Sequence, residues 1–121
     1  MCPGHLAYFR HKLLDWRRQV LQESQGALER IRTARSREGD LVDQGMAESD
    51  LTLDLANRER SRVLLEQIDA ALARIEDGSY GFCEETGEEI GLRRLEARPL
   101  ATLSIEAQER HELMVKRHRL Q

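Results

Sequence analysis

The sequence predicts a mainly α-helical protein, with a long antiparallel coiled-coil hairpin and a small head that ends in a helix. Three observations lead to this fold class. Charged residues make up 34% of the 121 residues, the aromatic residues are one Trp, two Tyr and two Phe, and two stretches with helically spaced apolar residues flank a short turn. So little bulky apolar material suits paired helices that bury a narrow seam. We expect the hairpin over residues 6–77 and the head over residues 78–121.

The first helix is expected from Leu6 to Arg37. Its apolar residues alternate at spacings of three and four, as in the seam between two packed helices, apart from a polar gap at Glu23. Residues 38–40, Glu-Gly-Asp, then supply a stop and a turn. The seam residues are Phe9, Leu13, Trp16, Val20, Ala27, Leu28, Ile31 and Ala34.

The second helix is expected to begin between Asp43 and Glu48 and to end at Asp77, before Gly78. Two helices of matched length joined by a short turn pack antiparallel. The turn, residues 38–46, is acidic, because six acidic residues and no Lys or Arg lie between residues 38 and 54. A solvated loop has the same composition, so this pattern alone assigns no role. The expected seam residues are Leu64 or Leu65, Ile68, Ala71, Leu72 and Ile75, with Leu51 and Leu55 nearer the turn.

The head is expected to turn at four glycines, since glycine adopts conformations that other residues avoid. A third helix is expected from Leu103 to Gln121, with Ser104 as its N-terminal cap. Such a head is too small to hold itself together, so we expect it to pack against the base of the hairpin. The glycines are Gly78, Gly81, Gly87 and Gly91, and the expected apolar cluster is Tyr80, Phe82, Ile90, Leu92 and Leu95.

Composition excludes several classes of function. A net charge of −3 is not the footprint of a nucleic-acid-binding protein. No apolar run reaches 18 residues and no signal peptide is recognisable, so we expect a cytoplasmic protein with no membrane segment and with free thiols at Cys2 and Cys83. The four histidines lack a partner at catalytic spacing and no phosphate-binding loop is present, so we expect no enzyme. A hairpin closed within one chain predicts a monomer.

The segment around Cys83 has the form of a zinc knuckle that lacks most of its ligands. Two Cys-x-x-Cys pairs would place thiols at positions 83, 86, 104 and 107, but these are Cys83, Thr86, Ser104 and Ala107. We therefore expect a degenerate zinc-finger-like head without zinc, in which Cys83 is a lone remnant ligand. A repaired site that uses His111 with Glu84 or Glu85 remains an alternative.

Residues 78–99 carry the strongest resemblance to a known family, through the run Cys-Glu-Glu-Thr-Gly-Glu-Glu-Ile-Gly-Leu-Arg-Arg-Leu-Glu-Ala-Arg-Pro over residues 83–99. Residues 101–111 resemble its cysteine-poor, zinc-independent branch, and residues 9–16 and 57–60 also fit. The chain resembles the DksA/TraR family, bacterial proteins that bind RNA polymerase rather than DNA. The resemblance runs from about Ala7 to His111.

The resemblance implies that the hairpin enters the secondary channel of RNA polymerase. There an acidic Asp-x-x-Asp-x-Ala tip acts near the catalytic centre and destabilises open promoter complexes. Asp40 and Asp43 match the two carboxylates, whereas Gly45 stands at the position of the alanine. The alternative for the carboxylates is an Asp-rich turn in which Asp43 caps a helix.

The resemblance also implies that Arg94 contacts the polymerase rim, where its planar guanidinium suits an acidic surface. The alternative is an ion pair with Glu88 or Glu96.

Many relatives bind guanosine tetraphosphate (ppGpp), the effector of the stringent response, with polymerase. Arg60 and Leu64 match that pattern, so ppGpp is an expected effector. Gln67 and Gln108 stand where lysines are typical, which weakens a site for a polyanion. Two other functions stay open. One is a channel-binding paralogue of weak output that competes with a stronger relative, and the other is a metal or redox sensor based on Cys83.

Overall fold

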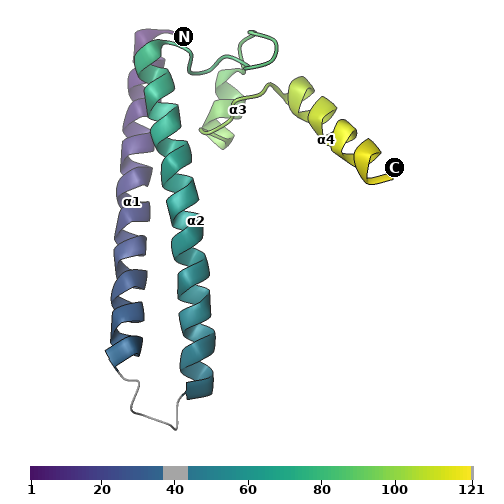
Figure 1. Ribbon diagram of the computed structural model, residues 1–121. Coiled ribbons are helices and arrows are strands. Elements are labelled where there is room, and N and C mark those ends of the chain that lie inside the picture. Colours follow the sequence, from purple (N-terminus) through teal and green to yellow (C-terminus); the bar gives the residue numbers. More distant parts are fainter. Residues whose placement is uncertain (37–43, 121) are drawn as a thin grey trace. The chain divides into compact units, whose positions relative to one another are not determined.

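The computed structural model describes residues 1–36 and 44–120 (Figure 1). These residues form four helices: α1 (Pro3–Ser36), α2 (Gln44–Asp77), α3 (Leu92–Ala97) and α4 (Ile105–Leu120). The β-structure among the described residues is one isolated antiparallel bridge between Phe82 and Glu89. The mainly helical fold class is therefore confirmed. No helix in the described part of the chain is both long and apolar enough to cross a membrane.

The chain divides into two compact units. We call Met1–Leu13 with Ala70–Gln121 the head unit, and Leu14–Asp69 the hairpin unit. Each unit contains a part of α1 and a part of α2. The N-terminal end of α1 and the C-terminal end of α2 thus belong to the head unit. The expected boundary between hairpin and head, after residue 77, coincides with the end of α2.

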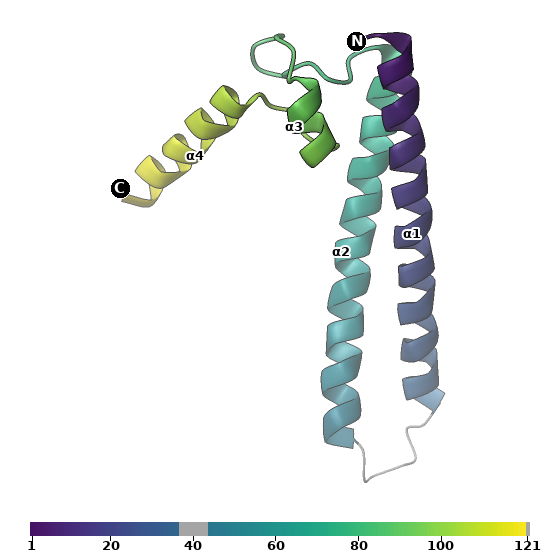
Figure 2. The ribbon, with the colours of Figure 1, turned by 180° about the vertical axis from the view of Figure 1, so that it is seen from behind.

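In the hairpin unit, α1 and α2 lie side by side and run antiparallel (Figure 2). The seam between them buries Val20, Ala27 and Ile31 of α1 and Ile68 of α2, each no more than 4% exposed. Ion pairs flank the seam, with Arg17 Nε 2.8 Å from Asp69 Oδ1 and Arg30 Nε 3.1 Å from Asp54 Oδ1. The expected antiparallel pairing rests on this apolar seam and its charged edges.

One expected seam residue is wrong. Leu55 is 45% exposed, whereas the Asp54 side chain is 15% exposed and pairs with Arg30. The buried face of α2 follows positions 54, 61, 64 and 68, which are three, four or seven residues apart and share one side of a helix. Residue 55 lies one position, and about 100°, away from that face.

The helix boundaries follow from local chemistry. Pro3 begins α1, where its missing N–H costs nothing. Gly78, with φ of 86°, ends α2, and the Asp77 carboxylate accepts hydrogen bonds from the Ser79 N–H at 2.8 Å and hydroxyl at 2.6 Å. Ser104 caps α4, because its Oγ accepts the Ala107 N–H at 3.2 Å. The expected cap is confirmed, and α4 begins two residues after the expected start.

The head unit packs on the end of α1, as expected. Phe9 and Leu13 of α1 are buried together with Tyr80 and Leu95. The Phe9 and Tyr80 rings lie 5.7 Å apart, and the Tyr80 hydroxyl donates to the Pro99 carbonyl at 2.8 Å. In the expected apolar cluster, Tyr80, Ile90 and Leu95 are buried and Phe82 is half-buried, but Leu92 is 45% exposed because it begins α3, a helix that the sequence did not predict.

Candidate functional site

The turn after Cys83 is built by backbone hydrogen bonds. The Gly87 N–H donates to the Cys83 carbonyl at 2.9 Å, and the Cys83 N–H donates to the Glu88 carbonyl at 2.8 Å. Gly87 adopts φ of 73°, a conformation that a side chain disfavours. These hydrogen bonds fold the chain back on itself over residues 83–88.

The Cys83 thiol is 3% exposed and is surrounded by hydrogen-bond donors. The Thr86 hydroxyl donates to its sulfur, followed in importance by the backbone N–H of Ser104 and those of Thr86 and Glu85. These donors stabilise the thiolate and outweigh the opposing effect of burial, so that the pKa of Cys83 falls from 9.0 to about 6. Thr86 is itself fixed, because its Oγ1 accepts the Glu88 N–H at 3.2 Å.

The four positions of a C4 zinc site therefore come together, but the residues present do not fit zinc. Cys83 offers one thiolate, Thr86 and Ser104 direct donors at it, and Ala107 is fully buried without a ligand atom. A structural zinc site needs about four N or S ligands in a tetrahedron. Among the described residues no group of three or more His, Cys, Asp or Glu could hold a metal ion.

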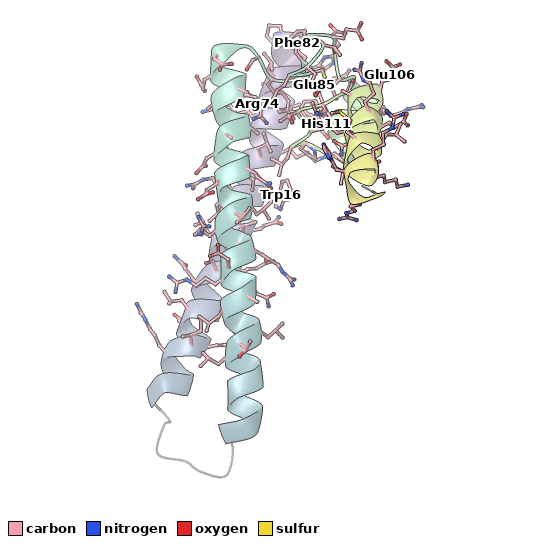
Figure 3. All side chains as sticks on the ribbon, turned by 45° about the vertical axis from the view of Figure 1, so that its right-hand side comes forward. Trp16, Arg74, Phe82, Glu85, Glu106 and His111 are labelled. Atoms are coloured by element: carbon pink, nitrogen blue, oxygen red, sulfur yellow. The ribbon has the colours of Figure 1, made fainter. Side chains whose placement is uncertain are left out.

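His111 does not repair the site. Its Nε2 instead pairs with Oε1 of Glu85 at the exposed surface of the head unit (Figure 3). This contact joins α4 to the turn that follows Cys83. The two halves of the knuckle are also joined beneath it, where the Glu84 N–H donates to the Thr102 carbonyl at 2.9 Å.

Arg94, the expected rim contact, lies half-buried in α3. Its Nε donates to the Leu103 carbonyl at 3.1 Å, which ties α3 to the segment that leads into α4. The alternative partners do not pair with it in the part of the chain that the structure describes: Glu96 pairs with Lys12 instead.

Glu96 is a second point of attachment for α3. Its Oε1 lies 2.9 Å from Lys12 Nζ and accepts the Tyr8 hydroxyl at 2.8 Å. Sequence reasoning missed this cluster. No local pattern predicts a contact between residues 84 positions apart.

Arg60 and Leu64 line a shallow cavity of about 480 Å³ between α1 and α2 in the hairpin unit. Gln67 is not among its lining residues, and Gln108 belongs to the head unit. The structure thus brings together the two residues expected to bind ppGpp. The other residues of the cavity are Val20, Glu23, Ala27, Arg30, Asn57 and Ser61.

The expected acidic tip lies mostly outside the described residues, since Asp40 and Asp43 fall between α1 and α2. Gly45 is the second residue of α2. The roles assigned to these three residues stay predictions.

A long helical hairpin combined with a knuckle of the C4 zinc-finger type defines a class of two-part, helix-rich proteins. Residues 5–75 match the family model for the N-terminal domain of DnaK suppressor protein DksA. Residues 78–113 match the model for the prokaryotic dksA/traR C4-type zinc finger. The chain belongs to the DksA/TraR family.

Relatives resemble it over nearly the whole chain. The RNA polymerase-binding transcription factor DksA of Caulobacter vibrioides (strain NA1000 / CB15N) is 52% identical over 119 residues, which cover 98% of this chain and 84% of that protein. Its namesake in Escherichia coli (strain K12) is 40% identical over 106 residues, covering 88% and 70%. The solved structure of transcription factor DksA2 from Pseudomonas aeruginosa has a TM-score of 0.88 and 42% identity, covering 98% and 89%.

Proposed function

We propose that this protein regulates transcription initiation by binding RNA polymerase. The observation that carries the proposal is the similarity to the Caulobacter protein, named for polymerase binding, over 98% of this chain. The similarity covers α1 to α4 together and is not confined to one motif.

The proposed mode of action is insertion of the hairpin into the secondary channel, with Asp40 and Asp43 near the catalytic centre. Two carboxylates there would act on the basic groups and metal ions that handle nucleotides, and so alter the lifetime of open promoter complexes. Promoter choice then follows from the stability of each open complex and needs no contact with bases. A net charge of −3 supports a protein partner rather than DNA.

The proposal includes a cytoplasmic monomer whose head works without zinc and which performs no catalysis. Support for the metal-free head comes from the donors around Cys83, which hold the thiolate where a metal ion would otherwise neutralise it. A redox or metal sensor based on Cys83 has less support, because the sulfur is buried and lacks a second thiol beside it.

We include in the proposal a weak response to ppGpp. Arg60 and Leu64 share one groove, which supports a basic and apolar contact. With Gln67 and Gln108 in place of lysines, we expect a weaker response than in a relative that has both cations.

The test measures binding of the purified chain to RNA polymerase and the half-life of open complexes on a ribosomal RNA promoter. The unmodified chain should bind and shorten the half-life. Asp40→Asn with Asp43→Asn should bind equally well but lose the effect. An unchanged half-life with the unmodified chain would refute the proposal.

Gly45 favours a second candidate, a channel-binding protein of weak output that competes with a stronger relative. Gly45→Ala restores the methyl group of the family pattern and favours helix in the first turn of α2 by up to about 1 kcal/mol. A marked gain in activity would support the competitor, whereas an unchanged activity supports the first proposal.

A further inference from the structure

Three consecutive side chains attach α3 to three different parts of the head unit. Arg94 bonds to the Leu103 carbonyl before α4, Leu95 is 1% exposed in the core, and Glu96 contacts α1. Consecutive helical residues point about 100° apart, so together they fix the rotation of α3 about its axis. The remaining side of the helix carries Arg93, which is exposed.

This short helix depends on those attachments. It has six residues, fewer than the number at which an isolated helix forms in water. Its N-cap is Gly91, which makes no side-chain capping bond. At the other end, the Arg98 N–H closes the last turn on the Arg94 carbonyl at 2.7 Å. The orientation of α3 is therefore set by its surroundings and not by its own stability.

The attachment to α1 is an ion pair supported by hydrogen bonds, and it involves both the side chain and the backbone of Glu96. Lys12 Nζ lies 2.9 Å from Glu96 Oε1 and 3.0 Å from the Glu96 carbonyl oxygen. Tyr8 adds its hydroxyl to the same Oε1 at 2.8 Å. A cation at the end of a helix also favours the exposed carbonyls there.

We propose that Glu96, held by Lys12 and Tyr8, is a positioning residue for polymerase binding. This positioning role rests on the proposed function. Glu96 would not touch polymerase itself but would hold α3 so that the arginines of α3 face the polymerase. Arg93 and Arg98 are exposed on the same short helix and its cap, so a rotation of α3 displaces all of its basic groups together.

The chain offers a matched control. Asp15 is also an exposed carboxylate paired with a cation, Arg18, but both residues lie in α1 and join no two elements. If Glu96 acts only through its charge on the surface, then Asp15→Asn and Glu96→Gln should change polymerase affinity alike. If it acts through the orientation of α3, only Glu96→Gln should.

The experiment measures polymerase affinity for five chains: unmodified, Asp15→Asn, Glu96→Gln, Glu96→Lys, and Lys12→Glu combined with Glu96→Lys. We expect Glu96→Gln to bind about threefold and Glu96→Lys about tenfold more weakly, and the swapped pair to return to within about threefold of the unmodified chain. Asp15→Asn should bind as the unmodified chain does. Helix content from circular dichroism verifies that each variant folds.

A spectroscopic readout reports the contact itself. The hydrogen bond to Glu96, with burial and the Glu96 charge, raises the pKa of Tyr8 above 10.0. Glu96→Gln should bring this pKa back toward 10.0. The pKa of Tyr80, which burial raises to about 12 with only a smaller contribution from the Glu96 charge, should fall much less. Ultraviolet titration of the phenolates separates the two.

The outcomes separate the two proposals. Polymerase binding by the unmodified chain, with equal affinity in Glu96→Lys, would overturn the positioning role and leave the proposed function standing. Failure of the swapped pair to recover affinity, although it folds, would also overturn it. Absence of binding by the unmodified chain would refute the proposed function itself.

Discussion

The Thr86 hydroxyl donates a hydrogen bond to the Cys83 sulfur, at the place where a C4 finger holds a metal ion between two thiolates. A C4 finger holds its cation among four thiolates, whereas in this chain several hydrogen-bond donors are directed at the single sulfur of Cys83. The backbone N–H of Ser104 joins the second half of the knuckle to the same sulfur. Hydrogen bonds thus join the two halves of the knuckle at positions where a C4 finger has metal ligands.

The first prediction concerns stability against pH. The pKa of Cys83 is about 6 in the folded chain and 9.0 ordinarily, so folding favours the thiolate. Its contribution is complete above pH 9, decreases as the pH falls, and is absent below about pH 6. In a Cys2→Ser background, the melting temperature should therefore rise with pH across this window more steeply than in a variant that adds Cys83→Ser. Thiolate absorbance near 240 nm should show a midpoint near pH 6. If the melting temperature rises equally steeply with pH in the two proteins, Cys83 does not form a stabilising thiolate.

The second prediction concerns metal removal. Because the residues at the four ligand positions do not fit zinc, protein purified without chelator should contain little zinc, and EDTA should leave its melting temperature unchanged. The matched variant carries Thr86→Cys, Ser104→Cys and Ala107→Cys, which complete four thiols. It should bind one zinc ion and become sensitive to EDTA. Near-stoichiometric zinc in the unmodified protein, measured by elemental analysis, would count against a metal-free head.

The third prediction tests the register of α2. Ile68 is fully buried and Leu55 is 45% exposed. Ile68→Ala should lower the free energy of unfolding by about 2–5 kcal/mol, whereas Leu55→Ala should change it by less than about 1 kcal/mol. Urea titration followed by circular dichroism measures both. Comparable losses would mean that the seam includes position 55.

The fourth prediction concerns the Tyr80 hydroxyl. Tyr80→Phe removes its bond to the Pro99 carbonyl and leaves that acceptor unpaired, so stability should fall by about 0.5–1.5 kcal/mol. The phenolate titration near pH 12 should disappear with it. Tyr8→Phe is the control, since it should remove the phenolate titration of Tyr8, which occurs at lower pH than that of Tyr80, and leave the Tyr80 titration in place. A Tyr80→Phe protein as stable as the original would show that the bond contributes nothing.

The sequence predicted the parts of the fold that depend on local pattern. The extents of α1, α2 and α4 to within three residues, the stop at Gly78 and the cap at Ser104 follow from spacing, glycine and capping residues. Helix α3 was missed because six residues contain too few turns to show a period. Leu55 was wrongly assigned to the seam because its apolar side chain does not show which face of α2 packs against α1. That face is defined by the positions of the other seam residues along the helix.

In the candidate site, too, the features that depend on local spacing could be predicted from the sequence, and those that depend on tertiary contacts could not. The loss of ligands around Cys83 was readable from spacing alone, but the role of Thr86 as a donor to sulfur depends on the geometry of the turn. The Lys12–Glu96 contact joins residues far apart in sequence, which only the tertiary structure brings together. The roles assigned to Asp40 and Asp43 rest on the family resemblance alone.

The shallow cavity in the hairpin unit has a consequence for motion. Between Val20 and Ile31 the facing positions include Glu23, Asn57 and Ser61, which supply little apolar contact. Hydrogen exchange should therefore be faster for backbone amides beside this gap than for those around Ile68, because local opening costs less where packing is sparse. We therefore expect the hairpin unit to bend most readily beside this cavity, where the facing side chains resist a change in helix spacing least.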